Sequence, residues 1–195
     1  MIILASTSAR RREMMERFLS KDEYKAIAPG VDEKIEKDVC AAEKVKILSL
    51  RKAKAIADKC PDDIVIGSDT VVALGDEILE KPRGRDDAYR MLRALSGKTH
   101  SVYSGIAVVR GDKSVVDVVR TDVFFRCLTD DEIYTYIDTC SPYDKAGAYG
   151  IQEEAGLFVE KIDGDINTVI GMPLTRLYLI LRDDFGYDLL GGGKR

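Results

Sequence analysis

The fold is decided at the N-terminus by Ile2-Ile3-Leu4-Ala5-Ser6-Thr7-Ser8-Ala9-Arg10-Arg11-Arg12-Glu13, an apolar strand that passes through small hydroxyl residues into a helix. Three arginines fall in the first helical turn, where backbone N–H groups are free and the helix dipole is positive. The dipole favours acidic residues there by about 0.3–1 kcal/mol each. Cations at this position make sense if an anion, such as a phosphate, neutralises them. The alternative is a solvated basic face that merely begins a helix.

Composition limits the class of protein. The chain has 195 residues, which is enough for one domain or two joined lobes. Its 45% hydrophobic and 33% charged residues are ordinary for a soluble globular protein. No apolar run approaches about 18 residues, and Ile2–Leu4 is too short for a signal-peptide core, so we expect a cytoplasmic protein without membrane contact. The net charge of −4 argues against nucleic-acid binding.

The cysteines and the single histidine do not form the pattern of a zinc site or a catalytic dyad. The cysteines are widely spaced without a C-x-x-C pair, which favours thiols in a reducing compartment over a zinc site: Cys40, Cys60, Cys127 and Cys140. His100, the single histidine, lies just ahead of a predicted strand, where we expect a structural role. Chemistry therefore falls to carboxylates, lysines and a hard metal ion.

The periodicity predicts alternating helices and strands. Five helices are expected. The first two run over about Ala9–Leu19 and over Val39–Lys59, the latter capped by Asp38. The others run from the cap Asp86 to before Gly97, from the Thr129–Glu132 capping box to about Thr139, and from Pro173 to near Gly186. Strands are expected at Ile2–Ala5, Tyr24–Ile27, Ile64–Ile66, Val71–Leu74, Glu77–Leu79, Ser101–Arg110, Ser114–Arg126 and Phe158–Ile162. The stretch 141–156 reads as a loop. Because hairpins intervene, the sheet should be mixed rather than purely parallel.

Four polar clusters fall at strand or helix ends, where α/β proteins build sites. They are the N-terminal loop with Ser6, Ser8, Arg10 and Arg11; Asp69, in the polar loop expected at 67–70; Lys81-Pro82; and the small-residue segment 144–152 with Lys145 and Gln152. A carboxylate at Asp69 can hold a divalent cation or deprotonate a water molecule, and the alternative is an aspartate that only forms a turn. Glu33 and Lys52 are more ambiguous. Glu33 is alternatively one of several solvated loop acids, and Lys52 is alternatively a lysine on the outer face of its helix.

Six motifs, in matching order, resemble the Maf family of nucleoside triphosphate pyrophosphatases, also called septum formation inhibitor proteins, over nearly the whole chain. These motifs are Leu4–Glu13, Gly67–Thr70, Glu80–Pro82, Ser96–His100, Asp144–Gln152 and Gly171–Leu174. The segment Lys-Ala-Gly-Ala-Tyr-Gly-Ile-Gln at 145–152 looks like the branch that hydrolyses dTTP and UTP, rather than the one acting on 7-methyl-GTP. Thr7-Ser8-Ala9 replaces the common Gly-Ser-Pro, and Met14-Met15 replaces a leucine pair; both changes leave the polar groups in place.

The resemblance implies an α/β fold with a mixed, elongated central sheet flanked by helices, in two lobes with a cleft between them, similar to inosine triphosphatases. It implies a single domain over residues 1–190, followed by a flexible tail over 191–195. The implied reaction is hydrolysis of dTTP or UTP, or of modified pyrimidine nucleotides, to the monophosphate and pyrophosphate with Mg²⁺ or Mn²⁺. A homodimer is compatible with the family.

Roles follow from the matched positions. Asp69 corresponds to the proton acceptor that activates water, and Glu33 would share the metal with it. The polar shell around the triphosphate matches Ser8, Arg11, Lys52 and Lys81. Positions tied to substrate choice match Arg10, Thr70 and Gln152, whereas Arg12 falls outside and should be an ordinary surface residue. The alternatives are a related enzyme with a different base specificity and a cell-division regulatory protein with little catalysis.

Overall fold

A computed structural model describes residues 1–35, 39–191, 193 and 194 of the chain. The chain divides into two compact units, each of which is described by itself. The first unit consists of Met1–Asp69, Ser104–Val119 and Gly171–Arg195, and the second of Thr70–Tyr103 and Arg120–Ile170. Among the described residues, no helix combines the length and the apolar character needed to cross a membrane.

The main sheet has seven strands and is mixed, as the sequence predicted. Its order is β2-β1-β3-β5-β6-β7, with β4 paired to β3. The strands are β1 (Ile2–Ala5), β2 (Tyr24–Ile27), β3 (Ile64–Leu74), β4 (Glu77–Leu79), β5 (Thr99–Arg110), β6 (Lys113–Phe125) and β7 (Val159–Asp163). Strand β1 is parallel to β2 and β3, whereas the β3–β4 and β6–β7 pairs are antiparallel. A two-residue turn joins β5 to β6, which only an antiparallel pair permits.

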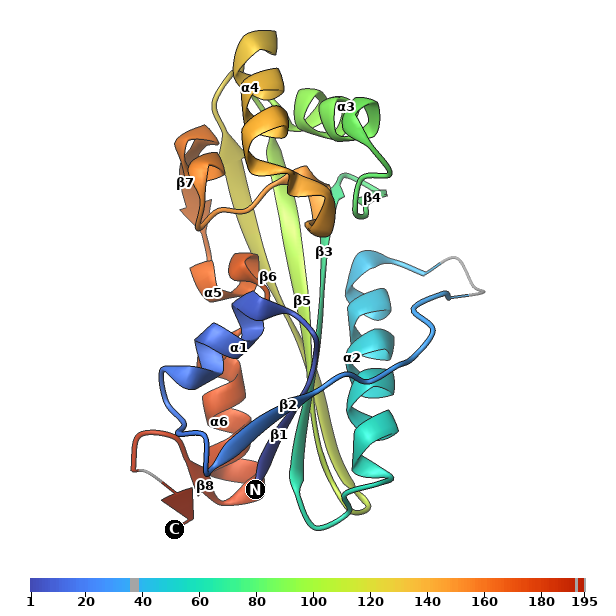
Figure 1. Cartoon of the computed structure of the whole chain (residues 1–195), viewed down its shortest axis with the longest axis vertical. Coiled ribbons are helices and arrows are strands. Elements are labelled where there is room, and N and C mark those ends of the chain that lie inside the picture. Colours follow the sequence, from blue (N-terminus) through green and yellow to red (C-terminus); the bar gives the residue numbers. More distant parts are fainter. Residues whose placement is uncertain (36–38, 192, 195) are drawn as a thin grey trace. The chain divides into compact units, whose positions relative to one another are not determined.

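In the first unit, helices cover both faces of the sheet. Helix α2 (Ala41–Ala57) lies on one side of β1 and β2, and α1 (Ala9–Glu16) and α6 (Leu174–Phe185) lie on the other (Figure 1). Helix α2 approaches the sheet closely: a Cβ on Gly67 would lie 2.2 Å from the carbonyl oxygen of Ser49. A Cβ on Gly105 would meet the Val45 carbonyl at the same distance. These glycines bring the backbone of α2 against β3 and β5.

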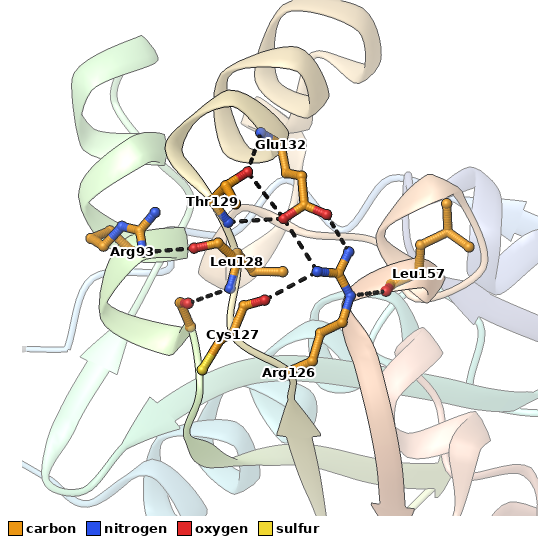
Figure 2. Close-up of polar contacts among 8 residues, drawn as sticks. Arg93, Arg126, Cys127, Leu128, Thr129, Glu132 and Leu157 are labelled. Atoms are coloured by element: carbon orange, nitrogen blue, oxygen red, sulfur yellow. Dashed lines mark hydrogen bonds and ion pairs between the residues drawn. The ribbon is translucent and has the colours of Figure 1, made fainter.

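The second unit packs α3 (Arg85–Leu95) and α4 (Asp130–Cys140) over its own core. This core includes Val72, Leu79, Leu92, Val102, Phe125, Ile133, Tyr149 and Phe158. The predicted capping box of α4 is confirmed: Thr129 Oγ1 accepts from the Glu132 backbone N–H, while the Glu132 carboxylate accepts from that of Thr129 (Figure 2). The Arg126 guanidinium also contacts Glu132 and, with the cap, lowers the pKa of that carboxyl to about 2.

Segments between the regular elements add several short helices. The region expected to be a loop contains three 3₁₀ helices, η1 (Pro142–Asp144), η2 (Ala146–Ala148) and η3 (Glu154–Phe158). Helix α5 (Ile166–Ile170) and the pair β8 (Tyr187–Asp188) and β9 (Gly193–Lys194) were not predicted. They are too short to give a clear periodic signal.

Two predicted helix starts were wrong. Helix α2 begins at Ala41 with Cys40 as its cap residue rather than at Val39, and the proposed cap Asp38 lies outside the described residues. Helix α3 begins after Gly84, so Asp86 lies within the first turn instead of capping it. Asp87 accepts from the Arg83 backbone N–H ahead of that turn. The N-cap of α3 is Gly84, and both Asp86 and Asp87 lie in the first turn. Acidic residues are favoured throughout the first turn of a helix, so their presence in the sequence does not fix which residue is the cap.

The expected polar loop at 67–70 was also wrong, because β3 runs without interruption from Ile64 to Leu74. Ser68 and Asp69 are both buried within the strand. Their polarity suggested a strand end, since buried polar groups need partners that a sequence does not show. The structure supplies those partners, and they define the candidate site.

Candidate functional site

A buried ion pair lies at the centre of the candidate site. Alternation along β3 directs Gly67 and Asp69 toward α2 and Ser68 toward the opposite face. On the α2 side, Lys52 Nζ lies 2.6 Å from Asp69 Oδ1, and the two side chains are only 7% and 9% exposed. The alternative interpretation of Lys52 as a residue on the outer face of its helix is therefore wrong.

Glu33 completes this cluster. The same Lys52 Nζ lies 2.7 Å from Glu33 Oε1, although the Glu33 side chain is 55% exposed. The loop that carries Glu33 is anchored by Arg51 of α2, which donates to the backbone oxygens of Asp32 and Lys34. One ammonium therefore joins a buried carboxylate to a carboxylate that solvent reaches.

A second set of contacts lies on the other face of β3. The Gly171 carbonyl oxygen accepts from Ser68 Oγ at 3.1 Å and from Arg11 Nε at 2.8 Å. Gly171 has φ of +132°, a conformation that strongly favours glycine. This turn links the first arginine-bearing helix to the centre of the sheet, which gives a structural reason for the motif at 171–174.

Ser8 and the three arginines occupy different environments. Ser8 is the N-cap of α1, with Oγ accepting from the Arg11 backbone N–H at 3.5 Å. A hydroxyl that accepts in this way still has a proton to donate to a ligand. The first turn of α1 contains no acidic residue. Arg10 and Arg11 are partly buried, whereas Arg12 is exposed.

The Arg11 guanidinium interacts electrostatically with the carboxylates of Asp69 and Glu33. Burial lowers the pKa of Arg11, while the negative charge of Asp69 raises it, Arg10 lowers it further and Glu33 raises it. The guanidinium is thus taken partly out of water close to the carboxylates of the site. An anionic ligand beside it would compensate that desolvation and neutralise the cationic start of the helix.

The donor set fits a small divalent cation. The part of the chain that the structure describes contains no group of three or more His, Cys, Asp or Glu side chains suited to a metal. However, Asp69 and Glu33 both direct an oxygen at the single point that Lys52 Nζ occupies. Mg²⁺ commonly binds through one or two carboxylates and takes its other ligands from water and substrate phosphates. Two converging carboxylates meet that requirement.

The remaining predicted residues belong to the second unit. Thr70 follows Asp69 in β3 and is partly buried, while Lys81 and Gln152 are exposed. The segment of Gln152 is tied to that of Lys81, because the Gly147 backbone N–H donates to the Glu80 carbonyl oxygen at 3.1 Å. Gly147 has φ of +68° and packs so closely that a Cβ would lie 3.0 Å from Val72.

Sequence reasoning missed three contributors to these clusters. Ser68 and Gly171 were quoted only as parts of motifs, and Lys145 only as a source of charge. Lys145 proves to be buried between two carboxylates of its own segment. The signal in the sequence that could have indicated a buried Lys145 is its position among small residues. His100, for which a structural role was predicted, is buried within β5, with Nε2 2.8 Å from the Tyr149 hydroxyl oxygen.

Comparisons with known proteins agree with the motifs. A family model described as "Maf-like protein" matches residues 1–184. A protein of Alkaliphilus oremlandii named dTTP/UTP pyrophosphatase is 45% identical over 97% of this chain and 98% of its own length. A protein of the same name from Geobacillus is 46% identical over 90% and 93%. A solved HAM1 protein from Coxiella burnetii aligns over 93% of this chain and 98% of its own, with a TM-score of 0.49 and 15% identity.

Proposed function

Because the chain belongs to the family of Maf-like proteins, we propose that it is a nucleoside triphosphate pyrophosphatase that hydrolyses dTTP and UTP. The observation that carries this proposal is the buried Asp69 carboxylate, which shares the Lys52 ammonium with the carboxylate of Glu33. The names of relatives that are 45% and 46% identical over most of the chain support the substrate class.

The chemical step needs one proton acceptor. A water molecule attacks the α-phosphorus, forming a new P–O bond, and the bond from that phosphorus to the bridging oxygen breaks. Pyrophosphate leaves with the bonding electron pair, and the attacking water gives a proton to Asp69. The ammonium of Lys52 donates to Asp69 Oδ1 at 2.6 Å and so fixes the orientation of the carboxylate that receives this proton.

The leaving pyrophosphate carries developing negative charge. Arg11 and Ser8, at the start of α1, would hold phosphate oxygens through the guanidinium and the hydroxyl, where the positive end of the helix dipole adds to the attraction. Lys52 and Lys81 would add positive charge around the triphosphate. Fixed cations that meet charge as it develops lower the barrier without reorganisation.

A divalent cation would be held by Asp69 and Glu33. When bound, Mg²⁺ or Mn²⁺ supplies charge neutralisation on the phosphates and acidifies water. The protein's contribution is to keep two hard oxygen donors aimed at one point. Lys52 stabilises that arrangement by satisfying both carboxylates.

Base selection would fall to Arg10, Thr70 and Gln152. A glutamine amide can both donate to and accept from the edge of a uracil or thymine ring. A base with a different donor pattern would leave polar groups unpaired, at roughly 1–3 kcal/mol each. The exposed amide of Gln152, on a tightly held segment, suits this role.

Product analysis tests the proposal directly. The purified protein is incubated with Mg²⁺ or Mn²⁺ and, separately, dTTP, UTP, CTP, GTP, ATP and modified pyrimidine triphosphates, and the products are separated by chromatography. We expect monophosphate and pyrophosphate, formed fastest from dTTP and UTP. Diphosphate with inorganic phosphate would contradict the reaction. Faster turnover of another nucleotide would contradict the substrate choice, and no turnover would leave the regulatory alternative.

A further inference from the structure

A second lysine is clamped between two carboxylates, in the segment that carries Gln152. Lys145 Nζ lies 2.8 Å from Asp144 Oδ1 and 3.2 Å from Glu153 Oε2. The Lys145 side chain is only 8% exposed, whereas Asp144 is 65% exposed and Glu153 38%. The ammonium therefore sits inside the fold while its partners reach the surface.

The aliphatic part of Lys145 supports the backbone that leads to Gln152. A Cβ on Gly150 would lie 2.7 Å from Lys145 Cε and 3.0 Å from both Lys145 Cδ and Glu153 Oε2. The backbone at Gly150 thus rests directly on the lysine stem. Any side chain at residue 150 would force Lys145 or Glu153 to move.

Other contacts fix the same backbone from different directions. The Gly150 N–H donates to the Tyr136 hydroxyl at 3.2 Å, and the Glu153 N–H donates to the Gly150 carbonyl oxygen at 3.0 Å. Tyr149 is held by His100 and packs edge-on to Phe125. Gln152 thus lies between a fixed Gly150 and a Glu153 whose carboxylate is held by Lys145.

We propose that Lys145 is a positioning residue for base selection: by bridging Asp144 and Glu153 beneath Gly150, it fixes the backbone that presents Gln152 to the nucleobase. Its ammonium is occupied by two carboxylates, which distinguishes it from a cation awaiting a phosphate. This inference rests on the proposed pyrophosphatase activity and assigns Lys145 a part in its substrate choice.

The main test compares selectivity in Lys145→Met, Glu153→Gln and the double variant. Methionine keeps much of the stem but removes the ammonium, and glutamine keeps the shape of Glu153 but removes its charge. We measure kcat and KM for dTTP, UTP and CTP. Each single variant should lower the ratio of kcat/KM for dTTP to that for CTP by roughly fivefold or more, the effect of one misplaced hydrogen bond. The double variant should lose no more than the worse single one.

Lys161→Met provides a matched control in the same unit. Lys161 is exposed on β7, over the ring of Phe124, and its loss should leave the dTTP-to-CTP ratio unchanged. An equal fall of kcat on every nucleotide in the Lys145 and Glu153 variants, with constant ratios, would overturn the proposal. Multiplying losses in the double variant would overturn it as well.

A second measurement covers the case in which Lys145→Met does not fold. Gly150→Ala should lower the Tm, because its methyl group would collide with Lys145, and adding Lys145→Ala should recover part of that loss by removing the obstructing stem. Gly150→Ala should also shift the dTTP-to-CTP ratio. An unchanged Tm or ratio would overturn the proposal. An inactive wild-type protein would overturn the proposed function together with this role, whereas an active one with constant ratios would overturn only the role of Lys145.

Discussion

Lys52 Nζ and Asp69 Oδ1 are 2.6 Å apart and almost completely buried, and the same ammonium reaches Glu33 at 2.7 Å. A buried charge is costly unless it is paired. In this cluster the lysine pairs with both acids that the sequence assigned to a metal. The arrangement therefore provides an internal cation at the point where the proposed divalent ion would be held.

Asp69→Asn should abolish most of the UTP hydrolysis while preserving the fold. Loss of the proton acceptor should reduce kcat by roughly 10²–10⁴-fold. Lys52 keeps Glu33 as a partner, so thermal unfolding should change much less than activity. Pyrophosphate release and circular dichroism check the two expectations. Near-normal kcat would refute the assignment of Asp69, and Asp63→Asn, at the N-terminal ion pair, provides a control away from the cluster.

Lys52→Met should increase the affinity of the nucleotide-free protein for Mn²⁺. Removal of the ammonium takes away the cation that both carboxylates contact, which should cost about 3 kcal/mol of unfolding free energy. Mn²⁺ should then raise the Tm of this variant more than that of the wild type, since a ligand that binds only the native state stabilises it. Calorimetric titration measures the affinity. Equal affinity in both proteins would contradict the metal site, and the exposed Lys54→Met on the same helix is the control.

Arg11→Lys should raise KM for the triphosphate by about tenfold or more. Lysine cannot reproduce the planar guanidinium fork, whose Nε donates to the Gly171 carbonyl oxygen. Because lysine retains the positive charge, a rise in KM would show that phosphate binding depends on the geometry of the guanidinium rather than on net charge. Arg12→Lys, at an exposed neighbouring position, should leave KM unchanged. Equal effects at the two positions would indicate a diffuse basic face, which was the alternative interpretation of the N-terminal arginines.

Gln152→Leu should change substrate choice more than catalytic competence. Loss of the amide should reduce the preference for dTTP and UTP over other nucleotides by roughly 5- to 100-fold, because hydrogen-bonding groups at the base edge would lose their partner. Steady-state kinetics with the full panel of nucleotides measures the ratio. Proportional losses on every nucleotide would mean that Gln152 only supports the fold. Glu160→Gln, exposed on β7, is the matched control.

His100 should make the protein less stable at mildly acidic pH. Burial lowers the pKa of His100 to about 4, with Asp122 opposing the shift. Between about pH 4 and pH 6.5 the unfolded chain binds a proton that the folded chain excludes, so stability falls as the pH falls through this range. The full effect is about 3 kcal/mol. His100→Gln keeps a group for Tyr149 but does not titrate, and urea unfolding at several pH values should show a weaker dependence. An identical pH dependence of the unfolding free energy in the wild type and in His100→Gln would contradict this role of His100.

Much of the local structure could be read from short-range patterns. The strand at Tyr24–Ile27, the hairpin around Gly75 and the capping box at Thr129 each depend on residues a few positions apart, and each is confirmed. The errors occur where tertiary contacts override such patterns. Asp69 lies in a strand interior instead of a loop because Lys52, 17 residues earlier, satisfies its charge there.

The family motifs, the mixed sheet and the approximate positions of the longer helices and strands could be predicted from residue order, because propensity, periodicity and turn chemistry act over a few residues. Which charges meet depends on how the whole chain packs. The tertiary structure placed Lys52 between Glu33 and Asp69, joined Arg11 and Ser68 through one carbonyl of Gly171, and clamped Lys145 beneath Gly150. The physical reason is that a buried charge takes whichever partner the packed backbone brings within hydrogen-bond distance, and residues up to 160 positions apart form those pairs.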